Sequence, residues 1–166
     1  MIEVKLIKDT FVIADEKDYQ RLYSKGFAEK IGKLFTLNLY ESCYLVEKGK
    51  IKIIKNSKEL KFESLMKLKE FNYSEYLVFC ELRSKGYIVK TGVKYGFPFR
   101  VYDKGLKIKD KHAIWLVEVY ENNTKIKITD ILSKNRISHT AKKKMLVAIV
   151  DSDRSVTFIE QDWLKV

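Results

Sequence analysis

The chain has 166 residues, enough for one large domain or two small ones, and its 46% hydrophobic residues suffice for a buried core. Lys and Arg number 33 against 22 Asp and Glu, and this surplus favours an anionic partner, nucleic acid ahead of a membrane surface. With one proline and seven glycines, a low-complexity chain is excluded. No apolar leader or membrane-spanning stretch is visible, so we expect a cytoplasmic protein that makes no membrane contact.

The first part of the chain, residues 1–71, is predicted to form a small mixed α/β domain. Apolar and polar side chains alternate at its start, and apolar residues recur at helical spacing ahead of Gly49. The expected elements are a strand or hairpin over 1–14, a mixed polar segment over 19–27, a helix over 37–47, a strand over 51–54 and a helix over 60–68.

The second part, residues 72–166, is richer in β-branched and aromatic residues and predicts a mixed sheet packed by two helices. Ser74 is the expected N-cap of a helix that ends at Gly86, and Thr129 that of a helix that ends near His139. Strands are expected over 87–91, 97–102, 113–120, 125–128, 145–150 and 155–159, the last two joined by the turn 151–154. The fold class is therefore α/β of the mixed α+β kind.

The positions of the charged residues and cysteines indicate which kinds of ligand to expect. Residues 133–144 hold five cations and no acid, although a Lys-rich composition also accompanies adaptation to heat. Cys43 and Cys80 have no histidine or second cysteine at ligand spacing. We therefore predict neither a metal site nor a cofactor, and we interpret both thiols as small buried side chains.

Three stretches resemble the C-terminal nuclease domain of archaeal tRNA-splicing endonucleases: YLVFCELRSKGYIVKTGVKYGFPFRVY, KHAIWLVEV and NRISHTAKKKMLVAIVDSD. LNLYESCYLVEKGKI, preceded by KGF, is similar to the family's N-terminal domain. In that family a tyrosine ending the FRVY-like strand, a histidine opening the next strand and a lysine after R-x-x-H form a catalytic triad. The resemblance places these at Tyr102, His112 and Lys143, the last counted four residues on from His139.

The chemistry implied by the resemblance is RNA cleavage by the substrate's own 2′-hydroxyl. That reaction needs a base, an acid for the leaving 5′-oxygen and a cation for the charged transition state. Tyrosine, histidine and lysine can fill these roles. Taken singly, an edge tyrosine, a lone histidine and a lysine in a triple lysine more often have no catalytic role.

The resemblance also implies a substrate and partners. Arg136 occupies the place of an arginine that stacks on a bulged base, with a plain phosphate contact as the alternative, and no second arm of that clamp is evident. Asp151 and Asp153 lie in a loop that docks into a neighbouring subunit, or else they only tip a hairpin. The expected partners are precursor tRNA with a bulge-helix-bulge motif and either identical subunits or a structural subunit in a heterotetramer.

Two other functions compete with this interpretation. A metal-dependent DNA nuclease would need E-x-K, but Glu118 is followed by Val119 and Tyr120. A noncatalytic structural or RNA-binding subunit of the same complex would lack part of the triad, whereas all three residue types are present here.

Overall fold

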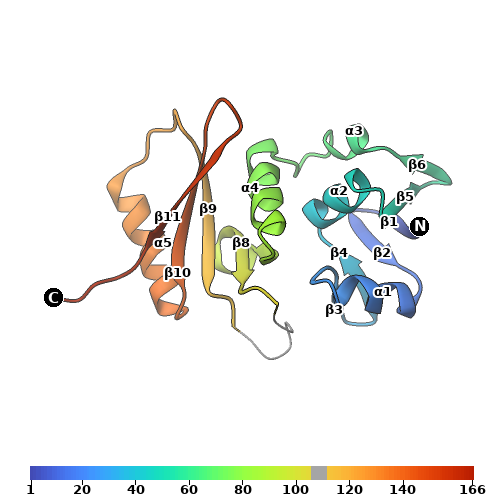
Figure 1. Ribbon diagram of the computed structural model, residues 1–166, viewed down its shortest axis with the longest axis horizontal. Coiled ribbons are helices and arrows are strands. Elements are labelled where there is room, and N and C mark those ends of the chain that lie inside the picture. Colours follow the sequence, from blue (N-terminus) through green and yellow to red (C-terminus); the bar gives the residue numbers. More distant parts are fainter. Residues whose placement is uncertain (106–111) are drawn as a thin grey trace. The chain divides into compact units, whose positions relative to one another are not determined.

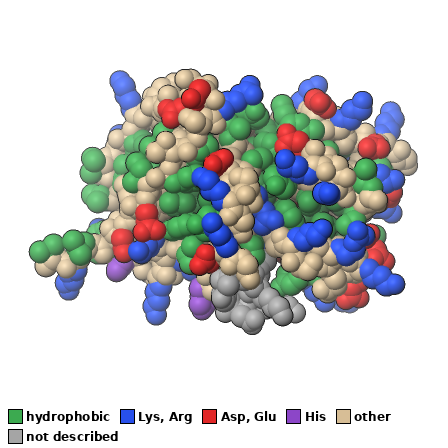
Figure 2. Space-filling view, in the orientation of Figure 1, with side chains coloured by type: hydrophobic (Ala, Val, Ile, Leu, Met, Phe, Trp, Pro, Cys, Tyr) green, Lys and Arg blue, Asp and Glu red, His purple; other side chains and the backbone are tan. Residues whose placement is uncertain are grey.

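The computed structural model describes residues 1–105 and 112–166, and the chain divides into two compact units, Met1–Tyr73 and Ser74–Val166 (Figure 1). Each unit contains one sheet of mixed strand direction with helices packed on it, so the mixed α/β class is confirmed. None of the helices within the described residues is both long and apolar enough to cross a bilayer. On the face shown in Figure 2, Lys and Arg side chains lie scattered among Asp and Glu.

The first unit is built on a six-stranded sheet with the order β3-β4-β2-β1-β5-β6, in which β1 and β5 run parallel. Side chains of β1 alternate between buried and exposed, with Ile2, Val4 and Leu6 facing the core. The elements are β1 Ile2–Ile7, β2 Thr10–Ile13, α1 Glu16–Tyr23, β3 Glu29–Ile31, β4 Leu34–Leu37, α2 Leu39–Glu47, β5 Ile51–Lys55, β6 Lys58–Leu60 and α3 Phe62–Leu65.

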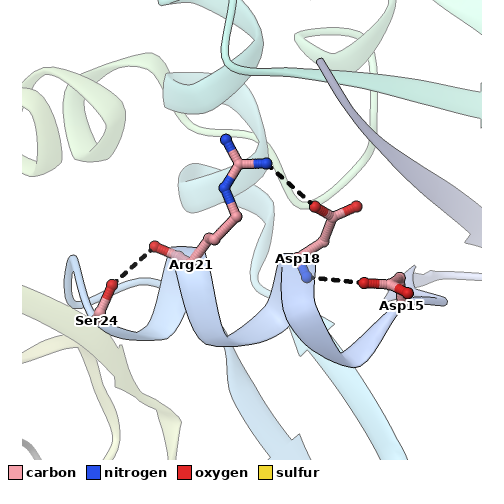
Figure 3. Close-up of polar contacts among 4 residues, drawn as sticks. All are labelled: Asp15, Asp18, Arg21 and Ser24. Atoms are coloured by element: carbon pink, nitrogen blue, oxygen red, sulfur yellow. Dashed lines mark hydrogen bonds and ion pairs between the residues drawn. The ribbon is translucent and has the colours of Figure 1, made fainter.

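Helix α1 was missed because most of its surface is polar. Asp15 caps it by accepting a hydrogen bond from the Asp18 amide at 3.0 Å, and the Ser24 hydroxyl closes its last turn on the Arg21 carbonyl (Figure 3). Only Tyr19 and Leu22 of the helix are buried. Two buried positions in eight residues make too short a pattern to distinguish from a polar loop.

Helix α2 confirms the predicted helix over 37–47. Asn38 and Glu41 form a capping box: the Asn38 side chain accepts from the Glu41 amide at 2.9 Å, and the Glu41 carboxylate accepts from the Asn38 amide at 3.1 Å. Gly49 follows the helix with φ of 62°, as expected of a glycine that ends one.

The helix predicted over 60–68 was wrong in its extent. Residues up to Leu60 belong to β6, which pairs with β5 through Ile53 and Leu60, and the helical part is the single turn α3. Strands β3 and β4 were also missed, since three or four residues carry little alternation.

The second unit contains a five-stranded sheet with the order β11-β10-β9-β8-β7, in which β9 and β10 run parallel and the other neighbours antiparallel. Helix α4 packs one face through Phe79 and Phe99, while α5 packs the other face, that of Glu118 (Figure 1). Its elements are α4 Tyr73–Ser84, β7 Ile88–Gly92, the 3-10 turn η1 Val93–Tyr95, β8 Phe97–Tyr102, β9 Trp115–Glu121, α5 Ile128–Thr140, β10 Lys144–Val150 and β11 Val156–Gln161. The predicted mixed sheet with two helices is confirmed.

The strand predicted over 125–128 was wrong. Strand β9 already has β8 and β10 on its two sides, so a strand directly after it has no free edge of β9 to join. These residues instead lead from the end of β9 into α5, the crossover that two parallel neighbours require.

Both helix caps predicted for this unit were misplaced. Ser74 lies inside α4, and its hydroxyl donates to the Glu121 carboxylate at the end of β9. Thr129 lies inside α5, whose N-cap position is Lys127, and the Thr129 carbonyl accepts from the Ser133 hydroxyl at 2.8 Å.

Candidate active site at one end of the second sheet

The sheet register places Tyr102 and Lys143 at the same end of three neighbouring strands. Val101, Trp115 and Lys144 are paired neighbours on β8, β9 and β10. One step further toward the sheet end, the Ile114 amide donates to the Val101 carbonyl at 2.8 Å and the Lys144 amide donates to the Ile114 carbonyl at 3.0 Å. Tyr102 follows Val101 on β8 and Lys143 precedes Lys144 on β10, so the two residues lie on either side of the start of β9.

The two side chains also leave the sheet on the same face. Neighbouring residues along a strand point to opposite faces, and the side chains of Arg100 and Leu116 share the face that α5 covers. Tyr102 shares that face with Arg100, to which it is hydrogen bonded, and Lys143 shares it with Met145 of the same core cluster. Both side chains are half-buried. A group held between them would meet a phenol on one side and an ammonium on the other.

His112 belongs to the same end of the sheet. It precedes Ile114 by two residues and is exposed, while its neighbour Ala113 is buried and fixes where the chain enters β9. The three predicted triad residues thus come from three neighbouring strand ends: Tyr102 closes β8, His112 precedes β9 and Lys143 precedes β10.

Lys143 is held by contacts that sequence reasoning did not identify. Its amide donates to the Ser138 carbonyl at 2.9 Å, and its Nζ donates to the Ala141 carbonyl at 3.3 Å. The same Nζ lies 5.5 Å from the centroid of the Tyr95 ring, within cation–π range. Nothing in the sequence set Tyr95 apart from nine other tyrosines.

The two neighbouring lysines, Lys142 and Lys144, are placed differently. Lys142 is exposed and has φ of 57° in the turn after α5. Lys144 lies 3.2 Å from one oxygen of Glu160, whose other oxygen accepts from the Trp115 indole at 2.8 Å. The indole hydrogen bond, followed by the Lys144 ammonium, lowers the pKa of Glu160.

Tyr102 also has a partner that the sequence did not indicate. Arg100, two residues earlier on β8, donates from Nε to the Tyr102 phenol oxygen at 3.1 Å. Its Nη1 donates to the Thr91 carbonyl at 2.8 Å. Residues i and i+2 on a strand share a face, which is the one signal that could have suggested this contact.

Helix α5 is pinned to the sheet through Lys134. Its ammonium lies 2.7 Å from the Glu118 carboxylate, donates to the Gly96 carbonyl and sits 4.6 Å from the centroid of the Phe97 ring. The other Glu118 oxygen accepts from the Val119 amide at 3.1 Å. Burial raises the pKa of Tyr120, and the charges of Glu118 and then Asp130 raise it further. Glu118, the acid considered for a metal-dependent nuclease, thus serves as the anchor of this helix.

Arg136 is exposed on α5, with its guanidinium 5.8 Å from the centroid of the Trp163 ring. The same indole lies 6.0 Å from the His139 ring. Trp163 follows the last strand, and sequence reasoning missed it because residues near a chain end carry no periodic pattern.

Asp151 and Asp153 lie in the turn between β10 and β11. The Asp151 amide donates to the Ser155 carbonyl at 2.9 Å, and one Asp153 oxygen accepts from both the hydroxyl and the amide of Ser155, at 2.6 and 2.9 Å. The hydroxyl, followed by the amide, lowers the pKa of the exposed Asp153. The turn is therefore locally ordered.

Comparison with known families covers both units of the chain. Residues 72–158 match the model described as tRNA intron endonuclease, catalytic C-terminal domain, and residues 2–66 match tRNA intron endonuclease, N-terminal domain. The chain belongs to the tRNA intron endonuclease family and is an RNA endonuclease, which confirms the resemblance seen in the sequence.

Curated relatives match along nearly their whole length. The chain is 39% identical over 170 residues to the tRNA-splicing endonuclease of Thermococcus onnurineus, covering 99% of this chain and 97% of that one. It is 38% identical to that of Pyrococcus horikoshii, with 99% and 97% covered. Identity to the Methanothermobacter thermautotrophicus enzyme is 37%, with 98% and 94% covered.

Proposed function

We propose that this chain is a catalytic tRNA-splicing endonuclease subunit that cuts precursor tRNA at bulge-helix-bulge intron–exon junctions without a metal ion. The observation that carries the proposal is that Tyr102, His112 and Lys143 lie at the same end of three neighbouring strands, β8, β9 and β10. Cleavage by a 2′-hydroxyl requires a base, an acid and a cation. The three residues can supply these groups at one place.

The proposed reaction is an in-line displacement at phosphorus. Tyr102, as its phenolate, takes the proton of the 2′-hydroxyl and becomes the neutral phenol, and the 2′-oxygen forms a bond to the phosphorus. The ammonium of Lys143 stabilises the additional negative charge of the phosphorane-like transition state. The bond from phosphorus to the 5′-oxygen breaks, and His112 gives that oxygen its proton. The products carry a 2′,3′-cyclic phosphate and a 5′-hydroxyl.

No step of this scheme passes through a metal or an organic cofactor, so the proposed cofactor set is empty. Glu118, on which the competing metal nuclease depends, is paired with Lys134 at 2.7 Å. An acid already neutralised by a lysine is a poor starting point for a cation site.

Substrate recognition is assigned to Arg136. Its guanidinium is exposed and lies beside the Trp163 ring, which orders the planar group. An unpaired base can stack on such a plane, whereas a base-paired one cannot reach it. We therefore propose that Arg136 holds a bulged nucleotide and that Trp163 supports it.

Assembly is assigned to Asp151 and Asp153 on the β10–β11 turn. Two carboxylates on an ordered, exposed turn suit a basic recess of another subunit, whether a second copy or a structural partner in a heterotetramer. The alternative to a catalytic role is a noncatalytic structural or RNA-binding subunit. That alternative predicts binding of precursor tRNA without cleavage by the purified chain.

The deciding experiment incubates the purified chain with a precursor tRNA containing the bulge-helix-bulge motif, with and without EDTA. We expect equal cleavage in both, 2′,3′-cyclic phosphate and 5′-hydroxyl ends, and no cleavage when the nucleotide at the cut carries a 2′-hydrogen. Cleavage of that deoxy substrate, or inhibition by EDTA, would support the metal nuclease. Intact RNA throughout would support the noncatalytic subunit.

A further inference from the structure

We propose that Arg100 is a positioning residue for Tyr102, holding the phenol oxygen as a hydrogen-bond acceptor so that this oxygen takes up the substrate's proton on the side away from the guanidinium. This inference rests on the proposed function, in which Tyr102 is the base. It adds a residue that neither the motif pattern nor the family comparison assigns to the reaction.

The direction of the contact follows from the chemistry of the two groups. Arg100 Nε lies 3.1 Å from the Tyr102 oxygen, and a guanidinium has only donors. The Tyr102 oxygen must accept, so its hydroxyl hydrogen cannot point toward Arg100. The same bond is possible for a phenol and for a phenolate, so the contact persists when Tyr102 takes up or releases a proton. Proton exchange is thereby confined to the side away from the guanidinium.

The guanidinium is itself anchored at a second point. Nη1 donates to the Thr91 carbonyl at 2.8 Å on the neighbouring strand β7. Two donors of one rigid fork thus reach acceptors on two strands, which fixes the plane of the group. A tyrosine at a strand end can change rotamer, and this clamp restrains it.

The anchor lies beside an irregularity in the sheet. The β7–β8 register shifts between Thr91 and Gly92, and a Cβ atom on Gly92 would lie 2.7 Å from the carbonyl carbon and oxygen of Phe99. Only glycine fits so close to the neighbouring backbone. β-Bulges commonly sit beside active sites and re-aim a side chain, and here the bulge lies next to the carbonyl that receives Arg100.

A double-mutant cycle tests the inference. Single-turnover cleavage of a bulge-helix-bulge RNA is measured at saturating protein for wild type, Arg100→Met, Tyr102→Phe and the double variant. Binding is measured with the same RNA carrying a 2′-hydrogen at the cut. We expect Arg100→Met to slow cleavage by roughly 10- to 100-fold, the scale of misplacing a catalytic group, with binding changed by less than about threefold.

The effect of Arg100→Met in the Tyr102→Phe protein decides whether Arg100 acts through Tyr102. If Arg100 acts through the Tyr102 oxygen, Arg100→Met should slow the Tyr102→Phe protein by no more than about twofold. An equal loss in both backgrounds, a loss of binding as large as the loss of rate, or a wild-type rate for Arg100→Met would each overturn the inference. The first two results would identify Arg100 as a direct phosphate contact.

Two controls keep the result interpretable. If Arg100→Met fails to fold, Arg100→Lys replaces it in the cycle, since lysine retains the charge but cannot form the two-point fork. It should then slow the wild-type background and leave the Tyr102→Phe background unchanged, and equal losses in both would again overturn the inference. A wild-type rate for Tyr102→Phe would instead contradict the proposed function, because Tyr102 would not be the base.

Discussion

The ammonium of Lys143 lies over the ring of Tyr95, 5.5 Å from its centroid, and Tyr95 itself packs against the core cluster of the second sheet. The cluster consists of Phe97, Leu116, Met145 and Val147. A flexible lysine placed ahead of a strand is thus held against a rigid aromatic surface. The position of this cation, which would stabilise the charged transition state, is therefore tied to hydrophobic packing.

Replacing Tyr95 should make the position of the Lys143 ammonium less restricted. We expect Tyr95→Leu to slow single-turnover cleavage about 10-fold, because a cation–π contact of about 1 kcal/mol is lost and Lys143 gains rotamers. Tyr95→Phe keeps the ring and should cleave at nearly the wild-type rate. Thermal unfolding of both variants separates loss of packing from loss of positioning. A Tyr95→Leu protein that is as fast as wild type would show that the ring does not position Lys143.

Removing the proposed acid, His112, or the proposed cation, Lys143, should lower the cleavage rate far more than replacing Tyr95. We expect His112→Ala and Lys143→Ala each to lower single-turnover cleavage by about 100-fold or more, with little change in RNA binding. His139→Ala is the matched histidine control. Lys142→Asn is the matched lysine control, because asparagine tolerates the left-handed backbone at that position. If a control variant loses as much activity as its partner, the assignment of that triad residue is wrong.

Arg136 should be needed as a planar group and not merely as a charge. We expect Arg136→Ala to weaken cleavage of bulged substrates by the equivalent of about 1–3 kcal/mol, the cost of losing one stacked base. Arg136→Lys should not restore it, since an ammonium offers no plane to stack on. Cleavage of matched RNAs with and without the bulged base is the measurement. Full activity of Arg136→Lys would indicate a simple phosphate contact.

The sequence was sufficient where a pattern is long or a motif is specific. Helix α2 has both a capping box and a terminal glycine, and the β-rich second half has aromatic and β-branched runs that predict its sheet. The triad positions came from a resemblance rather than from the residues alone. That they lie at the same end of three neighbouring strands became visible only in the strand order of the sheet, because pairing between distant strands has no local signature.

Contacts that support the site could not be predicted for a related reason. Arg100, Tyr95 and Lys134 are ordinary residue types at unremarkable spacings, and their partners lie on other elements. The strand predicted over 125–128 failed because local alternation says nothing about which sheet edges are already occupied.

The β10–β11 turn should lose order in acid. The folded-state pKa of Asp153 lies below its unfolded value, so its contribution to stability is present above about pH 3.9 and is lost as pH falls through the folded pKa. Ser155→Ala removes the hydroxyl, the main cause, and should raise the pKa of Asp153 toward its ordinary value. Carboxyl-carbon NMR titration measures this, with Ser152→Ala as the control from the same turn. An unchanged pKa in Ser155→Ala would show that the hydroxyl is not the cause.

The same turn supplies the test of assembly. Asp153 is fully exposed, and both of its hydrogen bonds from Ser155 go to one carboxylate oxygen, so the turn is shaped internally while its charge faces outward. In a chain of net charge +11, such acids suit a basic recess on another subunit, and truncating them would leave that recess with unpaired cations. We expect Asp151→Ala with Asp153→Ala to shift the particle to lower mass at moderate salt and to reduce cleavage, although neither residue takes part in the chemistry.

Asp151→Asn with Asp153→Asn removes the charge but keeps the shape of the side chains, and it should have the same effect if electrostatic attraction governs assembly. Sedimentation across a salt series at micromolar protein is the measurement. If both double variants keep the wild-type mass at every salt concentration, the two acids only form the tip of a hairpin.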